Sequence, residues 1–187
     1  MDARSVALAY GLSTISGLRA SLTIFAVALA INAGWLAPPQ SLAWLGADWI
    51  VWVAGAFTLL DFLGDKVPVV DHALQASHMF LAPVSGALAA GATDPTGGWS
   101  LWAVAGIGAL NALGVHAAKT TTRLGGSAAS LGTLTPAMSL VEDLLAVGGL
   151  ALAAFSPYAL VAVIALLAVA IVALVRRWQL RAAVRRI

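Results

Sequence analysis

The sequence predicts an all-α membrane protein, a polytopic bundle of about six transmembrane helices. Of its 187 residues, 61% are hydrophobic and only 10% are charged, and the mean hydropathy is +0.94. Several apolar runs reach about 18 residues or more, which is the length of helix that crosses ~30 Å of hydrocarbon. No polar stretch is long enough for a soluble domain. We therefore expect one integral membrane domain over residues 1–187, with halves at about 1–92 and 99–187.

Three spans are expected in the first half. Residues 6–33 form a helix that is longer than a perpendicular span requires, so it is tilted or broken. Residues 34–48 contain two adjacent prolines and two tryptophans, and Trp49 follows directly, which suits a loop at the membrane interface. The second span follows over about 50–65, and Pro68 ends it. Asp71 stands where the N-cap of the third span, about 73–92, is expected.

Three more spans are expected in the second half. Residues 99–119 form span four, and the small, polar residues of 120–134 predict an irregular segment. Thr135 is suited to the N-cap of span five and Pro136 to its first helical position. Span six, residues 158–175, contains no ionisable side chain, and we expect it to face lipid.

The lysines and arginines predict the orientation of the chain. The loops at 34–48 and 92–98 contain neither residue, which places them outside. The C-terminal segment is assigned to the cytoplasm by five arginines: Arg176, Arg177, Arg181, Arg185 and Arg186. Because an even number of spans places both termini on the same side, six spans put Arg4 in the cytoplasm as well. We expect a multi-pass protein of the inner (plasma) membrane with both termini cytoplasmic.

Composition also limits the partners and the chemistry. The formal net charge of +2 and its confinement to short segments give no reason to expect nucleic-acid binding. Cysteine is absent, which excludes disulfides and thiolate metal sites. No Gly-x-Ser-x-Gly or His-Glu-x-x-His motif is present, so we expect neither an enzyme nor a bound cofactor. The expected partners are membrane lipids and, because a bundle this small often needs a second subunit to enclose a path, another copy of the chain.

The candidate functional residues are the ionisable side chains inside the spans, because charge within a bilayer costs roughly 3 kcal/mol on insertion scales. Five ionisable groups occur in residues 59–72 alone. Asp61 and Asp65 lie four residues apart and share a helix face. Arg19 lies about a dozen residues inside its span, so we expect it to pair with one of four acidic residues. The full candidate set is Arg19, Asp61, Asp65, Lys66, His116, Lys119, Glu142 and Asp143.

Three functions are compatible with these residues. In the first, a transporter or channel, they line a polar path for an ion or small solute; carboxylates suit proton relay or a hard cation. The candidate metal ligands are Asp61, Asp65, Glu142 and Asp143. In the second, a structural or accessory protein, the buried charges fix helix register. In the third, His78 and His116 are axial haem ligands, although isolated histidines more often serve as hydrogen-bonded packing residues.

Two pairs of segments predict an internal repeat. Residues 11–20 are similar to residues 108–117, with glycines and a basic or histidine side chain at matching positions. Residues 59–61 are similar to residues 140–142, because in both segments an acidic residue follows two apolar ones. Because each half has three expected spans, the two copies would have opposite orientations, which is a recurrent plan of transporters with a site at the repeat interface.

Four motifs are similar to those of the bacterial inner-membrane family catalogued as domain-of-unknown-function family 4126, and they span nearly the whole chain. They are Gly17-Leu18-Arg19-Ala20, Asp65-Lys66-Val67-Pro68 with Asp71, His116-x-x-Lys119 with Arg123, and Ser139-Leu140-x-Glu142-Asp143. The resemblance implies a small helical membrane protein and no particular activity. A weaker resemblance, to manganese and calcium exchangers, is confined to residues 61–67, where an extra residue precedes the glycine and Val67 replaces serine or threonine.

Overall fold

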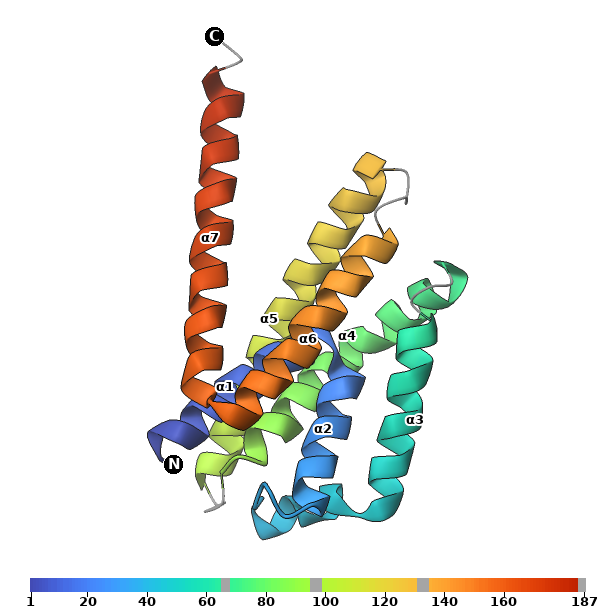
Figure 1. Ribbon diagram of the computed structural model, residues 1–187, viewed down its shortest axis with the longest axis vertical. Coiled ribbons are helices and arrows are strands. Elements are labelled where there is room, and N and C mark those ends of the chain that lie inside the picture. The colour runs from blue at the N-terminus through green and yellow to red at the C-terminus, as the bar shows by residue number, and fades with distance from the viewer. Residues whose placement is uncertain (65–67, 95–98, 131–134, 185–187) are drawn as a thin grey trace.

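A computed structural model of the chain is all-helical (Figure 1). The structure describes residues 1–64, 68–94, 99–130 and 135–184, and no strand occurs among them. The elements are α1 (Ala3–Leu18), α2 (Ala20–Asn32), the 3-10 helix η1 (Gln40–Gly46), α3 (Asp48–Gly64), α4 (Pro68–Gly91), α5 (Trp99–Ser130), α6 (Thr135–Phe155) and α7 (Pro157–Val184). The all-α prediction is confirmed.

Three helices of the described chain are long and apolar enough to cross a membrane. They are Leu101–Arg123 within α5, Ala137–Phe155 within α6 and Pro157–Arg177 within α7. η1 and α3 count as a fourth if this pair, bent by 60°, is taken as one span. These helices are compatible with a membrane protein, whereas the count of six spans stays a prediction.

The first 32 residues do not cross the bundle in one line. The helix breaks at Arg19, whose φ of −144° and ψ of 86° are not helical. Near the start of α1, the hydroxyl of Thr93, just after α4, donates to the Ser5 carbonyl at 3.2 Å. At the end of α2, Asn32 Nδ2 donates to Asp48 Oδ1, at the start of α3, at 2.8 Å. Because α3 and α4 are antiparallel, the start of α3 and the end of α4 lie at the same end of the bundle (Figure 1). The start of α1 and the end of α2, which contact them, therefore lie at that end as well. Of the two predicted alternatives, a tilted or a broken helix, the structure has the broken one, and its two halves fold back on each other.

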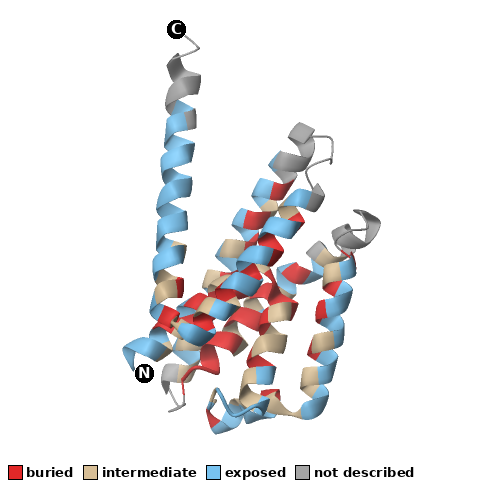
Figure 2. Cartoon of the chain, viewed as in Figure 1, coloured by how far each residue is buried: buried red, intermediate tan, exposed pale blue. Residues whose placement is uncertain are grey.

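α1 lies at the centre of the bundle and packs against α4, α5, α6 and α7. Figure 2 shows buried residues concentrated around it. Small residues bring the backbones of α4 and α5 close together. A Cβ added to Gly86 of α4 would lie 2.5 Å from the Gly108 carbonyl oxygen of α5, and a Cβ added to Gly108 would lie 2.5 Å from the Gly86 carbonyl oxygen. Such close approach is typical of helix pairs in membranes.

α7 contacts the rest of the described chain only near its beginning. Leu160 is buried and packs against Gly11 of α1 and Gly149 of α6. Beyond Ile164 the described apolar side chains are exposed, and the helix projects away from the bundle (Figure 1). Contact of residues 158–175 with lipid stays a prediction.

Two local predictions are wrong. Residues 120–130 are not irregular, because α5 continues to Ser130. The hydroxyls of three consecutive threonines donate to carbonyls one turn earlier in the same helix, at 2.9, 2.8 and 2.7 Å, so polar side chains here do not require a loop. Asp71 is not an N-cap, because α4 already begins at Pro68; proline fits a first helical position, where no N–H is needed.

Candidate functional site

Arg19 occupies the break between α1 and α2 and is only 1% exposed. Its Nη2 forms an ion pair with Asp143 Oδ1 and donates to Ser139 Oγ at 3.2 Å, both on α6. Its Nη1 lies 3.9 Å from Asp61 Oδ2 on α3. The predicted pairing of Arg19 with a carboxylate is therefore confirmed, and one guanidinium links two other helices to the break.

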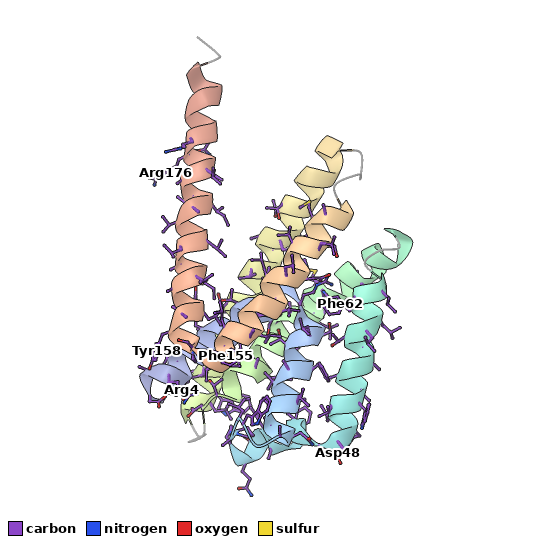
Figure 3. The ribbon with its side chains drawn as sticks, viewed as in Figure 1. Arg4, Asp48, Phe62, Phe155, Tyr158 and Arg176 are labelled. Carbon is purple, nitrogen blue, oxygen red and sulfur yellow. The ribbon has the colours of Figure 1, made fainter. Side chains whose placement is uncertain are left out.

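Asp61 is the acidic centre of this first cluster. It is 1% exposed and receives a hydrogen bond from Ser21 Oγ of α2 at 2.5 Å. His78 Nε2 of α4 lies 3.1 Å from Asp61 Oδ1. The next residue, Phe62, places its ring 5.3 Å from Arg19 Cζ, a cation–π distance, and is labelled near the upper part of α3 in Figure 3. Three helices thus converge on one carboxylate beside the break.

A second cluster surrounds Glu142 of α6. Lys119 Nζ lies 3.2 Å from Glu142 Oε2, and Arg123 Nε donates to Glu142 Oε1 at 2.9 Å, both from α5. Lys119 Nζ also donates to the Leu18 carbonyl at 2.6 Å. The second cluster therefore reaches the same break from the other side. The two clusters together contain three basic and three acidic side chains in the described chain: Arg19, Lys119, Arg123, Asp61, Glu142 and Asp143.

Two histidines lie between the clusters. The ring centroids of His78 and His116 are 6.4 Å apart, with the ring planes at 63°. The His116 ring, on α5, forms a hydrogen bond with the Gly17 carbonyl of the break. His116 Nδ1 is buried and has no hydrogen-bond partner among the described residues. His78 is bound to the first cluster and His116 to the break, so the pair connects Asp61 with the α5 side of the site.

The break exposes backbone carbonyls that side chains of α5 then satisfy. In a continuous helix each carbonyl would bind the N–H four residues later. Here Leu18 and Gly17 instead accept from Lys119 and His116. Such bonds can be exchanged for bonds to an ion or solute without unwinding a helix, which is why interrupted helices are suited to binding sites in membranes.

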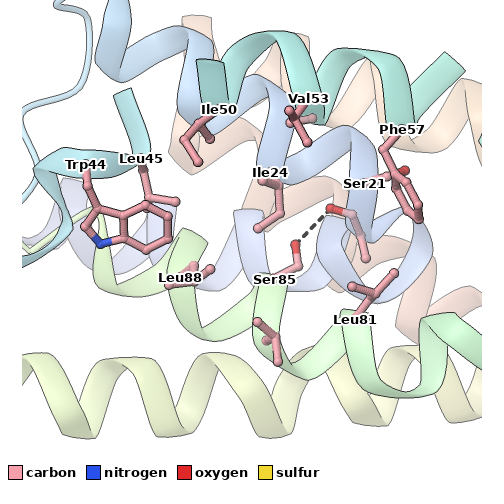
Figure 4. A pocket seen from close by; sticks show the side chains of 13 residues that line it. Ser21, Ile24, Trp44, Leu45, Ile50, Val53, Phe57, Leu81, Ser85 and Leu88 are labelled. Atoms are coloured by element: carbon pink, nitrogen blue, oxygen red, sulfur yellow. Dashed lines mark hydrogen bonds between the residues drawn. The ribbon is translucent and has the colours of Figure 1, made fainter. Parts of the chain in front are cut away.

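An apolar cavity of about 240 Å³ lies beside the first cluster, between α2, α3, α4 and η1 (Figure 4). Its hydroxyl-bearing lining residues are Ser21 and Ser85. Ser21 is the residue that donates to Asp61, and Ser85 Oγ donates to the Ala20 carbonyl at 2.9 Å. The first residues of α2 therefore line the cavity, and one of them, Ser21, is hydrogen-bonded to the buried carboxylate of Asp61.

The structure brings together six of the eight residues that the sequence predicted: Arg19, Asp61, His116, Lys119, Glu142 and Asp143. Asp65 and Lys66 lie outside the described residues. Within the described part of the chain, no group of three or more histidine or acidic side chains is arranged to hold a metal ion. The site residues that the prediction missed are Ser21, His78, Arg123 and Ser139.

The spacing in α5 could have identified one of these missed residues. His116, Lys119 and Arg123 follow one another at intervals of three and four, which is the spacing of a single helix face. Arg123 had been assigned to an irregular segment, and its role depends on the helix continuing past it. The two serines and His78 carry no comparable signal, because each acts through a contact with a distant helix.

No curated protein and no solved structure matches this sequence. One family does match: a domain of unknown function, DUF4126, over residues 6–177. This range contains every residue of both charged clusters and all the motifs on which the resemblance rested. The chain therefore belongs to the DUF4126 family.

Proposed function

We propose that the protein is a small membrane transporter or channel that moves an ion or small solute past the two charged clusters. The observation that carries the proposal is the position of Arg19, a buried cation at the interruption of a helix, bound by carboxylates of two other helices. Transporters commonly bind solutes at discontinuous helices near the middle of the bilayer. The proposal does not depend on the 3+3 inverted repeat, which stays a prediction.

The site is also suited to changes of partner. Arg19 is shared between Asp61 and Asp143, and Glu142 is shared between two basic residues. An ion or charged solute that replaces one partner leaves the other in place, so a single buried charge is never left alone. This sharing lowers the barrier to exchange relative to an isolated buried pair, whose separation costs about 3–5 kcal/mol.

A structural or accessory role is the second candidate, and one observation favours it. The numbers of basic and acidic side chains in the two clusters are equal, as expected if the charges only hold the helices in register. The haem alternative has less support, because His78 Nε2 is already within 3.1 Å of Asp61. We propose no enzymatic activity and no nucleic-acid partner.

We further propose that the protein lies in the inner membrane with its C-terminus in the cytoplasm, as the C-terminal arginines favour. The route of the chain supports an outer N-terminus in place of the cytoplasmic one predicted from six spans. Figure 3 labels Arg4 and Asp48 toward one end of the long axis and Arg176 toward the other. We also propose that the exposed part of α7 contacts lipid. Assembly with a second copy of the chain stays a prediction.

Asp61→Asn tests the function. The amide keeps the shape of the side chain, and Arg19 keeps Asp143 and Ser139 as partners, so the variant should be extracted at normal yield. In reconstituted vesicles it should lose the flux that the wild type shows over a panel of cations, protons and small organic ions. Asp48→Asn, at the start of α3, is the matched control and should retain the flux, because Asp48 contacts Asn32 far from the clusters.

The accessory role predicts the opposite pattern. Wild-type vesicles would then move no member of the panel, and Asp61→Asn would lower yield and thermal stability because the buried groups around Asp61 lose a charged partner. That combination would exclude the transport proposal and favour the accessory role.

A further inference from the structure

We propose that the proton is the ion that this site exchanges, with His116 Nδ1 as the atom that receives it and His78 and Asp61 as the groups that pass it on. The inference rests on the transport function proposed above and names its ion. It is carried by the geometry of the histidine pair, which leads from the Gly17 carbonyl at the break to Asp61 in the first cluster.

His116 has a nitrogen ready to accept a proton. The side chain is 7% exposed, and its ring donates to the Gly17 carbonyl. A neutral imidazole has one N–H donor and one bare acceptor nitrogen, so the remaining nitrogen, Nδ1, is the acceptor. It has no hydrogen-bond partner among the described residues. A proton can therefore bind to Nδ1 without breaking a hydrogen bond between described residues.

His78 can carry the proton onward. Its Nε2 lies 3.1 Å from Asp61 Oδ1, and its ring faces His116 edge to face at 6.4 Å. That centroid distance is longer than a direct hydrogen bond between two rings, and one water molecule spans such a gap. An imidazole can accept a proton on one nitrogen while it releases one from the other, so His78 can act as a shuttle.

The transfer is balanced as follows. A proton bound at His116 Nδ1 gives an imidazolium, which then passes a proton to Nδ1 of a neutral His78 that carries its own proton on Nε2. His78 Nε2 simultaneously releases its own proton to Asp61 Oδ1. Both rings end neutral, and Asp61 ends as a carboxylic acid. The net change is one proton moved from His116 to Asp61, with no other bond made or broken.

Protonation of Asp61 has a consequence for the ion pairs. The neutral acid no longer attracts the Arg19 guanidinium 3.9 Å away, whereas the ion pair of Arg19 with Asp143 is unchanged. Proton arrival on α3 would therefore weaken the attraction of α3 for a buried cation and leave that of α6 in place. This is the kind of change that couples a proton to the movement of a solute.

Charged groups from each neighbouring helix act on this relay. Lys119 on α5 and His78 on α4 oppose a positive charge on His116, whereas the Gly17 carbonyl at the break favours it. The carboxylates of the two clusters are Asp61 on α3 and Glu142 and Asp143 on α6, and of these Asp61 lies beside His78. Among the described residues the two clusters contain equal numbers of basic and acidic groups, so a proton taken up by the histidine pair adds one positive charge to a balanced set.

The test measures proton movement directly. Vesicles containing the wild-type protein and an entrapped pH-sensitive dye are given an imposed voltage. We expect proton flux well above that of empty vesicles, and a loss of about tenfold or more in both His116→Gln and His78→Gln, as for removal of a general acid–base group. Asn111→Ala is the control: Asn111 is on α5 and bonds Ser13 of α1, so its loss should leave proton flux intact.

Two results overturn the inference while leaving the transport function in place. One is wild-type flux of another solute without proton flux, and the other is unchanged proton flux in both histidine variants. Vesicles that move neither protons nor any solute would contradict the proposed function itself. If the variants do not fold, nitrogen-15 NMR of the wild-type protein decides: at neutral pH we expect His116 Nδ1 to be unprotonated, and a proton found there overturns the relay.

Discussion

Lys119 Nζ donates to the Leu18 carbonyl at 2.6 Å, at the residue where α1 ends. In an uninterrupted helix this carbonyl would accept from the backbone N–H four residues later. An ammonium from α5 takes that place and at the same time pairs with Glu142. The break in the first helix is therefore stabilised by a side chain 101 residues away in sequence, and it holds Arg19 between α3 and α6.

Lys119→Met should destabilise the folded protein by about 1–3 kcal/mol, the cost of leaving a buried polar group without its partner, because Glu142 keeps Arg123 as a basic partner. The Leu18 carbonyl also loses its donor. The free energy of unfolding can be measured by reversible denaturant titration in detergent micelles. Arg177→Met is the control, since Arg177 is exposed on α7 and should have little effect. Equal effects of the two substitutions would contradict a role for Lys119 at the break.

Gly17→Ala should also be destabilising, by about 1–3 kcal/mol. A Cβ at this position would lie 2.5 Å from both the Ala112 carbonyl oxygen and Val115 Cβ on α5. Gly114→Ala is the matched control on α5, where nothing lies within 4 Å of the added Cβ. There alanine should be neutral or stabilising by up to about 1 kcal/mol, because it is the better helix former. The same unfolding titration compares the two variants.

Arg19 and Asp143 should be coupled in a double-mutant cycle. Arg19→Gln removes the cation that Asp61 and Asp143 share, and Asp143→Asn removes the closer of these two carboxylates from Arg19, so each should be more destabilising than Asp61→Asn. The double variant should be less destabilised than the sum of the two, by about 0.5–3 kcal/mol. Unfolding free energies of the four proteins give the coupling directly. Additive effects would show that the ion pair does not contribute to stability.

The cost of buried charge made much of the site predictable from sequence. Arg19 was expected to find an acidic partner because a lone guanidinium within a span is so unfavourable, and it contacts Asp143 and Asp61. Helix starts were also readable, because Thr135 and Pro157 begin α6 and α7 to within a residue of the predicted positions. These features depend on local chemistry or on a single large energy.

Features that depend on tertiary contacts could not be predicted. The chain folds back at Arg19 because Lys119 and His116 satisfy the carbonyls there, and no local pattern encodes those contacts. His78 reads as a packing residue until α4 places it beside Asp61. The similar segments at 11–20 and 108–117 also occupy different environments. The first contains the end of α1 and the break, and the second lies inside one continuous helix.

The fold-back of α1 and α2 predicts the sidedness of the chain, which can be tested because the natural sequence has no cysteine. Ala3→Cys is at the first residue of α1, and Trp35→Cys follows α2, where the tryptophan is 81% exposed. Because both positions lie at the same end of the bundle, both should react with a membrane-impermeant maleimide added to intact cells. Gln179→Cys, toward the far end of α7, should react only after permeabilisation, since basic C-terminal segments stay in the cytoplasm. Reaction of Trp35→Cys but not Ala3→Cys in intact cells would mean that α1 and α2 cross the membrane once, with both termini cytoplasmic.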